Sequence, residues 1–127
     1  MSYKHYNPNP YGRHVDDCTV RAASKALDQS WEETFVGLSM QAFADGDIMD
    51  AKANMCAYLQ SKGFRRFAIP DTCPACYTVA QFAQDHPTGT FVLGGGDHVV
   101  AVVDGDWYDT WDSRDMVPLY VWVKGER

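Results

Sequence analysis

Long apolar runs are missing from this 127-residue sequence. A membrane-spanning helix needs roughly 20 consecutive apolar residues, and no stretch approaches that length. The N-terminal segment MSYKHYNPNPYGRH also lacks the apolar core of a secretory signal. We therefore expect a cytoplasmic protein that makes no membrane contact.

Positive charge is scarce as well. The chain has 11 Lys and Arg against 17 Asp and Glu, which gives a formal net charge of −6. An acidic surface repels phosphate groups, so the composition argues against a nucleic-acid or anionic-lipid partner. The tightest basic cluster, Arg65-Arg66 with Lys62 nearby, is small enough to be an ordinary solvated surface.

Cysteine occurs four times, at positions 18, 56, 73 and 76, which is too few and too uneven for a disulfide scaffold. Without an export signal, all four are expected to be thiols in a reducing compartment. Cys73 and Cys76 form a Cys-x-x-Cys pair, for which we favour a structural or incidental role. Half of a metal site and a dithiol redox pair remain the alternatives. Only Cys56 is left as a further cysteine ligand, so we expect no bound metal.

The sequence does contain enough apolar surface for one domain, spanning residues 1–127. Hydrophobic residues make up 46% of it. Helical spacing dominates the first part of the chain, whereas short apolar strands with turn signals dominate the second. Residues 1–15, rich in Tyr, Asn and Pro, are expected to form turns. Helices first and antiparallel strands second predict an α+β domain.

The expected elements follow from caps and periodicity. The helices are residues 18–27, a helix opened by a capping box at Ser30, a third starting after Asp47 or Asp50 and stopping before Gly63, and residues 78–85. The strands are residues 64–69, 90–93, 98–103, 107–111 and 119–123, with a hairpin turn at Asp104-Gly105.

Three residues on these elements form a candidate catalytic constellation. A cysteine nucleophile needs a lowered thiol pKa, a base within reach and a group that orients the base. Cys18 opens the first helix, where the helix dipole and free N–H groups favour a thiolate. His98 opens a buried strand, and Asp109 lies on the partner strand of the hairpin, where it can hold the other ring nitrogen. Asp112 is an alternative orienting residue, because the hairpin register is not fixed by sequence.

Other neighbours of this constellation have two interpretations each. Arg21 lies one helical turn beyond Cys18 and is expected to pair with Asp16 or Asp17, which we interpret as an ordinary ion pair on the helix surface. Residues 94–96 are three glycines, and the backbone of Gly95 and Gly96 could hydrogen-bond an extended substrate. A flexible turn between strands explains the same glycines equally well.

Three segments, taken in order, resemble the papain-like cysteine peptidase superfamily, particularly its compact bacterial and phage members, similar to bacteriocin-processing-like peptidases. Asp17-Cys18 at the start of an Ala-rich helix is similar to the nucleophile helix of that superfamily. His98-Val-Val-Ala-Val-Val103 is similar to its histidine strand. Tyr108-Asp109-Thr110-Trp111 is similar to the segment where those enzymes place Asn or Asp, a small hydroxyl residue and Trp.

The resemblance covers about residues 14–30 and 90–113 and implies a papain-like fold, with N-terminal helices packed on a C-terminal antiparallel sheet. It also implies a cysteine peptidase, or a related amidase or acyl transferase, acting on a protein or peptide without a cofactor. Family members place a Gln before the nucleophile to complete the oxyanion hole, and this sequence has none there. Asn9, Arg13 or His14 would have to replace it, or the backbone N–H of Cys18 would have to serve alone.

An alternative from a different functional class is a catalytically inactive papain-like scaffold that binds another protein, for example in a phage–host interaction. The missing Gln favours this alternative. So does Asp17, because a carboxylate beside a thiol raises the thiol pKa unless another group pairs with it.

Overall fold

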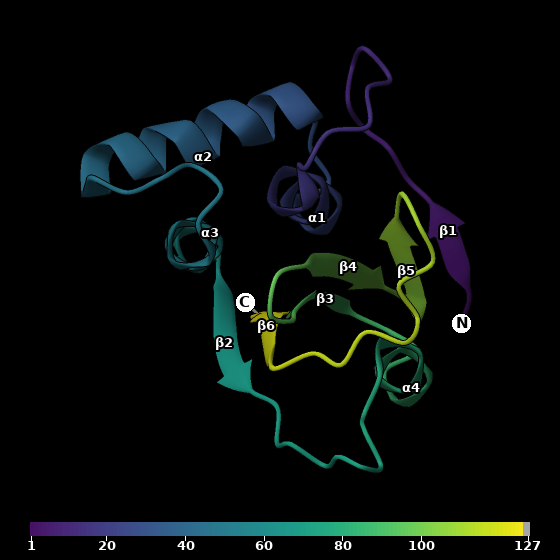
Figure 1. The fold of residues 1–127 in the computed structure, drawn as a ribbon. Helices are drawn as coiled ribbons and strands as arrows, with labels where there is room; N and C mark the ends of the chain where they lie inside the picture. Colours follow the sequence, from purple (N-terminus) through teal and green to yellow (C-terminus); the bar gives the residue numbers. More distant parts are fainter. Residues whose placement is uncertain (126–127) are drawn as a thin grey trace.

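The computed structural model describes residues 1–125 as a six-stranded sheet with helices on both faces (Figure 1). The elements in chain order are β1 (Tyr3–His5), α1 (Cys18–Leu27), α2 (Trp31–Asp45), α3 (Lys52–Ser61), β2 (Phe64–Ala68), α4 (Val79–Asp85), β3 (Thr90–Gly94), β4 (Val99–Val103), β5 (Asp106–Asp109) and β6 (Tyr120–Lys124). The predicted α+β class is confirmed. None of the helices within residues 1–125 is long and apolar enough to cross a membrane.

The sheet is mixed rather than purely antiparallel. Its strand order is β1-β5-β4-β3-β6-β2, and β1 pairs with β5 in parallel, with Tyr3 opposite Trp107 and His5 opposite Asp109. The expectation that residues 1–15 form only turns is therefore wrong for residues 3–5. The reason is that β5 ends the hairpin with an unpaired edge, whose N–H and C=O groups the N-terminal segment satisfies.

The hairpin between β4 and β5 was predicted from Asp104-Gly105. Both residues have positive φ, 51° and 82° respectively. Positive φ at both central positions characterises the turn whose twist matches that of paired strands. The turn sets the register in which Ala101 lies opposite Tyr108, and it brings the end of β5 back beside the start of β4.

Two apolar clusters lie on opposite faces of the sheet. One joins α1, α2 and α3 to side chains such as Val92, Val99 and Trp122, and the other joins α4 to Leu93, Val100 and Val121. Consecutive residues of β3 and β4 thus face opposite clusters, because side chains alternate along a strand. This explains why residues 91–93 of β3 and all of β4 are apolar, since both faces of these strands are covered.

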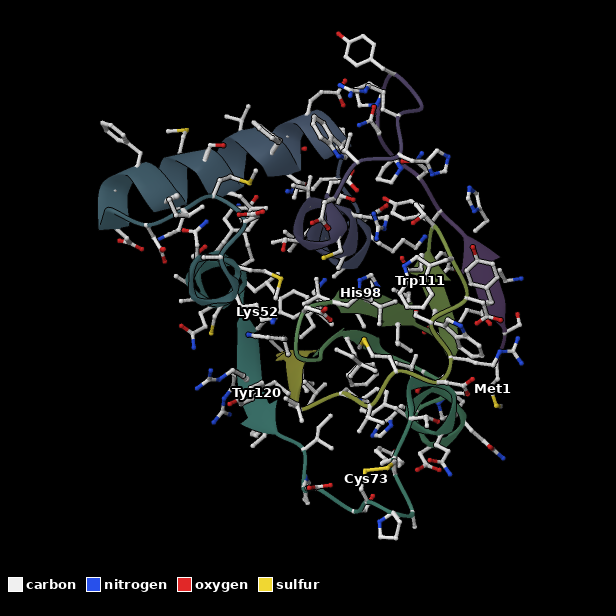
Figure 2. The ribbon with its side chains drawn as sticks, in the orientation of Figure 1. Met1, Lys52, Cys73, His98, Trp111 and Tyr120 are labelled. Carbon is white, nitrogen blue, oxygen red and sulfur yellow. A yellow bond between two sulfur atoms is a disulfide. The ribbon has the colours of Figure 1, made fainter. Side chains whose placement is uncertain are left out.

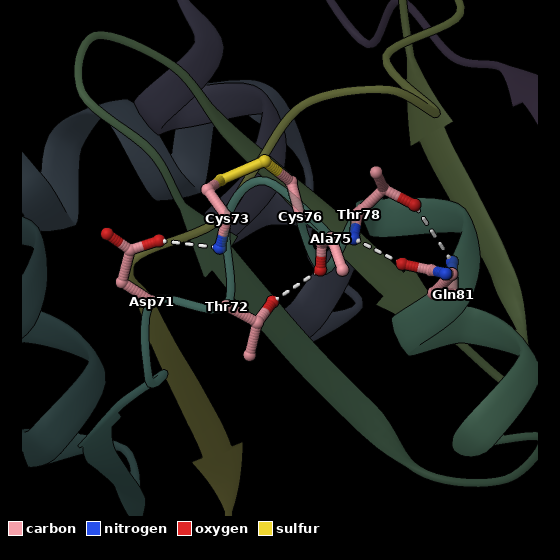
Figure 3. The surroundings of a disulfide bond; sticks show 7 residues. All are labelled: Asp71, Thr72, Cys73, Ala75, Cys76, Thr78 and Gln81. Carbon is pink, nitrogen blue, oxygen red and sulfur yellow. Dashed lines mark hydrogen bonds between the residues drawn. A yellow bond between two sulfur atoms is a disulfide. The ribbon is translucent and has the colours of Figure 1, made fainter.

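The Cys-x-x-Cys pair forms a disulfide in the loop between β2 and α4 (Figures 2 and 3). The expectation of thiols is therefore wrong for Cys73 and Cys76, whereas Cys18 and Cys56 are free. The cause is local: a turn in which Thr72 Oγ1 donates to the Ala75 carbonyl, 2.7 Å away, brings the two Cα atoms to 4.1 Å. Because both sulfurs are in the disulfide, this pair cannot provide two thiolate ligands for a metal.

Candidate active site

The three predicted catalytic residues meet at one end of the sheet, beside the start of α1. Cys18 is the first residue of α1, His98 directly precedes β4, and Asp109 is the last residue of β5. α1 packs against β4 and β5, so its N-terminal turn lies over the ends of both strands. Figure 2 shows His98 and Trp111 together near α1, and their ring centroids are 4.9 Å apart.

Asp109 holds the His98 ring. Its Oδ2 lies 2.6 Å from Nε2 of His98, and the carboxylate has no solvent exposure. Ser113 Oγ donates to the same oxygen at 2.8 Å, and the Thr110 backbone N–H donates to Oδ1 at 2.8 Å. With Nε2 engaged by Asp109, Nδ1 is the ring nitrogen left to serve the thiol.

The Cys18 thiol is half-buried and lies in the same pocket as His98. Burial raises its pKa, but hydrogen bonds with His98 and the Val99 backbone outweigh that effect. The charges of His98 and Arg21 act in the same direction, so the net pKa of Cys18 lies below its ordinary value. A lowered thiol pKa is the property that a cysteine nucleophile requires.

The pKa of His98 moves in the opposite sense. Burial lowers it, but the hydrogen bonds with Asp109 and Cys18 and their charges raise the pKa to about 9. Burial raises the pKa of Asp109, yet the His98 and Ser113 hydrogen bonds, the imidazolium charge and the Arg21 charge hold it below its usual range. The three groups together therefore favour a thiolate beside an imidazolium, with an ionised carboxylate behind it.

Arg21 differs from its predicted role. It is not a surface residue: it is 4% exposed, and its two terminal nitrogens bind two different carboxylates. Nη1 lies 2.6 Å from Oδ1 of Asp17, and Nη2 lies 2.9 Å from Oδ1 of Asp109. The interpretation as an ordinary surface ion pair is wrong, because packing of α1 on the sheet turns this face of the helix inward.

Asp17 occupies the N-cap position of α1, but its side chain makes no capping hydrogen bond. The carboxylate instead accepts from Arg21 through Oδ1 and from Trp31 Nε1 through Oδ2, the latter at 2.9 Å. The first-turn N–H groups, which include that of Cys18, are thus not blocked by a side-chain cap. Free N–H groups at a helix start can stabilise the negative oxygen that develops when a carbonyl beside a cysteine is attacked.

Cys18 and His98 share a pocket of about 220 Å³, which is also lined by Asp16, Thr19, Asp50, Lys52, Asp97 and Val99. A second hollow of about 360 Å³ shares Asp16 and Asp50 with the first. These two exposed residues therefore form the boundary between the hollows. The second hollow is mainly apolar, with Val20, Trp31, Phe35 and Met49 among its walls.

The remaining predicted site residues lie elsewhere. Asp112 accepts hydrogen bonds from Trp107 Nε1 and from Arg114, so its carboxylate serves those groups rather than His98. Asn9 caps its own loop through Tyr11 N–H and lines the second hollow rather than the pocket of Cys18. Arg13 lines that second hollow as well, and His14 is an exposed residue of the same segment.

The glycine segment offers little backbone to a substrate. The Gly95 N–H is already bound to the His98 carbonyl at 2.8 Å, and Gly95 itself is buried. Gly96 is exposed, and its carbonyl accepts from the Lys52 ammonium. The structure thus favours the interpretation of this segment as a turn that positions His98.

Sequence reasoning missed three contacts of this site. Arg21 and Ser113 bind Asp109, and Trp31 binds Asp17. The predicted pairing of Arg21 with Asp17 is confirmed, whereas Ser113 follows a strand and its spacing from Asp109 gave no signal. Within residues 1–125, no group of three His, Cys, Asp or Glu side chains is arranged to hold a metal ion.

No family model, no curated protein and no solved structure matches this chain.

Proposed function

We propose that this protein is a papain-like thiol hydrolase, most simply a cysteine peptidase, with Cys18, His98 and Asp109 as its catalytic triad. The observation that carries the proposal is the position of His98, which lines the same pocket as Cys18 and binds the buried Asp109 carboxylate through Nε2. The base thus lies between the nucleophile and the orienting group, as acyl transfer by a cysteine requires.

The first half of the reaction is acylation. The Cys18 thiolate attacks the carbonyl carbon of an amide, a C–S bond forms, and the carbonyl oxygen becomes negative. The Cys18 backbone N–H at the start of α1 stabilises that oxygen. The His98 imidazolium then gives its proton to the amide nitrogen, the C–N bond breaks, and the amine leaves a thioester on Cys18.

The second half is hydrolysis of the thioester. Neutral His98 takes a proton from water, the resulting hydroxide oxygen attacks the thioester carbon, and the C–S bond breaks. The products are a carboxylic acid and a Cys18 thiolate beside an imidazolium, which restores the starting state. Asp109 keeps the ring in one orientation and stabilises its charged form throughout. No step needs a cofactor.

The hollows beside Cys18 support a peptide as the substrate. The pocket of Cys18 is polar, and it shares Asp16 and Asp50 with the apolar hollow lined by Trp31 and Phe35. An extended peptide can place its reacting carbonyl in the first and a side chain in the second. The order of the elements also supports the papain-like assignment, because the nucleophile helix comes first and the histidine and aspartate strands follow in one sheet. Deamidation and acyl transfer use the same steps with another amine or acceptor.

The test compares Cys18 with Cys56, the other free cysteine among the described residues, which is also partly buried. The protein is treated with limiting iodoacetamide between about pH 5 and pH 8, and the modified peptides are quantified by mass spectrometry. A catalytic Cys18 is alkylated at mildly acidic pH, well before Cys56. Equal alkylation of the two at every pH, or faster alkylation of Cys56, would overturn the proposal. Cleavage of an internally quenched peptide library then identifies the substrate.

A second candidate function is protein binding, and the exposed face of α2 favours it. Val36, Met40 and Phe43 are 55%, 68% and 91% exposed, and they lie along one shallow apolar hollow. Apolar surface of this kind marks interaction sites on many proteins. This function would be favoured over hydrolysis if Cys18 is not alkylated selectively and if the protein binds a partner protein that the Phe43→Ser variant no longer binds.

A further inference from the structure

Arg21 is the buried cation behind the candidate triad. It is enclosed by α1 and the sheet, and each end of its guanidinium fork binds a separate carboxylate, Asp17 on one side and Asp109 on the other. These two acids are far apart in sequence but share one positive charge. A buried carboxylate without a partner is strongly unfavourable, so the loss of Arg21 would destabilise both Asp17 and Asp109 in their buried positions.

The two carboxylates have opposite relations to the proposed chemistry. Asp109 is needed as an anion behind His98, whereas Asp17, adjacent to Cys18 in the chain, would oppose formation of a thiolate. Both oxygens of Asp17 are engaged, Oδ1 by Arg21 and Oδ2 by Trp31. The negative charge of Asp17 is therefore partly neutralised by the Arg21 guanidinium.

We propose that Arg21 is a positioning residue of the reaction: it fixes Asp109 against His98 and neutralises Asp17 beside the nucleophile. This inference rests on the proposed function. It explains how an acid next to Cys18 is compatible with a reactive thiol, which was one of the two objections to catalysis from the sequence. A planar guanidinium suits this task better than an ammonium, because it can bind two carboxylates at once in fixed geometry.

Other charges also face the thiol, and the test has to account for them. Asp16, Asp50, Asp97 and Lys52 line its pocket together with His98. The three acids are exposed, so water screens them. Arg21 is buried, and its charge lowers the pKa of Cys18 and that of Asp109.

The experiment measures the pH midpoint of Cys18 alkylation by iodoacetamide, which needs no substrate. In Arg21→Met the midpoint should rise by about one pH unit or more, because the cation is lost and Asp17 is left uncompensated. Adding Asp17→Asn to Arg21→Met should recover at least half of that rise. Arg21→Lys should give an intermediate midpoint, because one ammonium cannot reproduce the fork.

Lys25→Met is the matched control. Lys25 lies one turn further along α1, over the Tyr6 and Tyr108 rings, and its removal should leave the midpoint unchanged. A purely structural Arg21 would lower the melting temperature without moving the midpoint, and that result in a folded Arg21→Met protein overturns the inference while the proposed function stands. A wild-type midpoint as high as that of free cysteine overturns the proposed function, and the role of Arg21 with it.

If Arg21→Met does not fold, Asp17→Asn alone tests the same idea from the other side. This variant removes the negative charge beside Cys18 and leaves Arg21 bound to Asp109. The midpoint should then fall below that of the wild type. An unchanged or raised midpoint in Asp17→Asn would contradict the neutralising role.

Discussion

Two cysteine-containing regions of this molecule are built in different ways. Around Cys18, the groups that matter come from distant parts of the chain: Arg21 and Asp109 are separated by 88 positions and are buried together. Around Cys73 and Cys76, the bond joins residues three positions apart. The supporting hydrogen bonds, from the Cys73 N–H to Asp71 and from the Thr72 hydroxyl to the Ala75 carbonyl, are local and exposed (Figure 3). The chemistry of Cys18 therefore depends on the whole fold, whereas that of the loop depends on one turn.

The largest expected effect is a loss of turnover on substitution of Cys18 that does not occur on substitution of Cys73 and Cys76. Cys18→Ala should reduce turnover to background, because no other group can form the thioester. The free energy of unfolding should change by no more than about 1 kcal/mol, since α1 gains a better helix former. Replacing Cys73 and Cys76 by Ser is the matched control and should leave turnover unchanged. The measurements are peptide cleavage and urea unfolding; loss of several kcal/mol in Cys18→Ala would identify a packing residue instead.

Asp109→Ala should have the next largest effect, on both activity and stability. Turnover should fall by about two to four orders of magnitude but leave a remnant, because an orienting group contributes less than the nucleophile. The unfolding free energy should drop by about 3 kcal/mol, since Arg21 loses one of its two buried partners. Asp112→Ala removes an acid from the neighbouring turn without touching His98, so its turnover should stay close to wild type. Equal losses in the two variants would contradict the assignment of Asp109.

The pH dependence should follow His98. Its pKa is raised to about 9 from 6.5, so the imidazolium that protonates the leaving amine persists through neutral pH. Turnover should therefore decline as pH rises through about 9. The stabilisation from this group has the same sign: it is fully present below pH 6.5 and is lost as pH rises through about 9. In Asp109→Asn the alkaline decline of turnover should shift to lower pH. If it does not shift, the decline reports the titration of a group other than His98.

The smallest effect is expected in the loop. Reduction of the Cys73–Cys76 disulfide opens a very short ring, so the unfolding free energy should fall by less than about 2 kcal/mol. The rate of Cys18 alkylation in the double Ser variant should match that of the wild type, because the loop contributes no residue to the lining of the pocket that holds Cys18. A change in that rate would show that the two regions are coupled.

The success of prediction from the sequence also differs between local features and features that depend on the whole fold. Helix α1 was predicted at its observed bounds, because small apolar residues at helical spacing are a local signal. The β4–β5 turn was predicted from two residues for the same reason. The hairpin also predicted that His98 and Asp109 would come together, whereas the expectation of Cys18 beside them came from the resemblance to papain-like peptidases.

What escaped prediction depends on pairing at long range. Strand β1 forms only because β5 offers an open edge, and nothing in the Tyr-rich N-terminal segment identifies that partner. Arg21 looked like a surface residue because its spacing from Asp17 is equally typical of exposed ion pairs. Its second partner, Asp109, becomes visible only when α1 is packed on the sheet. Burial of a charged residue follows from tertiary packing, and local periodicity does not report it.

The pairing of β1 with β5 has a consequence for the order of folding. Tyr3 donates its hydroxyl to the Asp109 carbonyl across 106 positions of sequence, and the Tyr6 N–H binds that same carbonyl at 2.8 Å. Contacts of such long range close the largest loops and form slowly. Asp109 therefore reaches its final position only after most of the chain has been made and has folded back on its first residues. A nascent or truncated chain that ends before β5 has a thiol and an imidazole but no assembled site, so reactivity at Cys18 should appear late, together with completion of the fold.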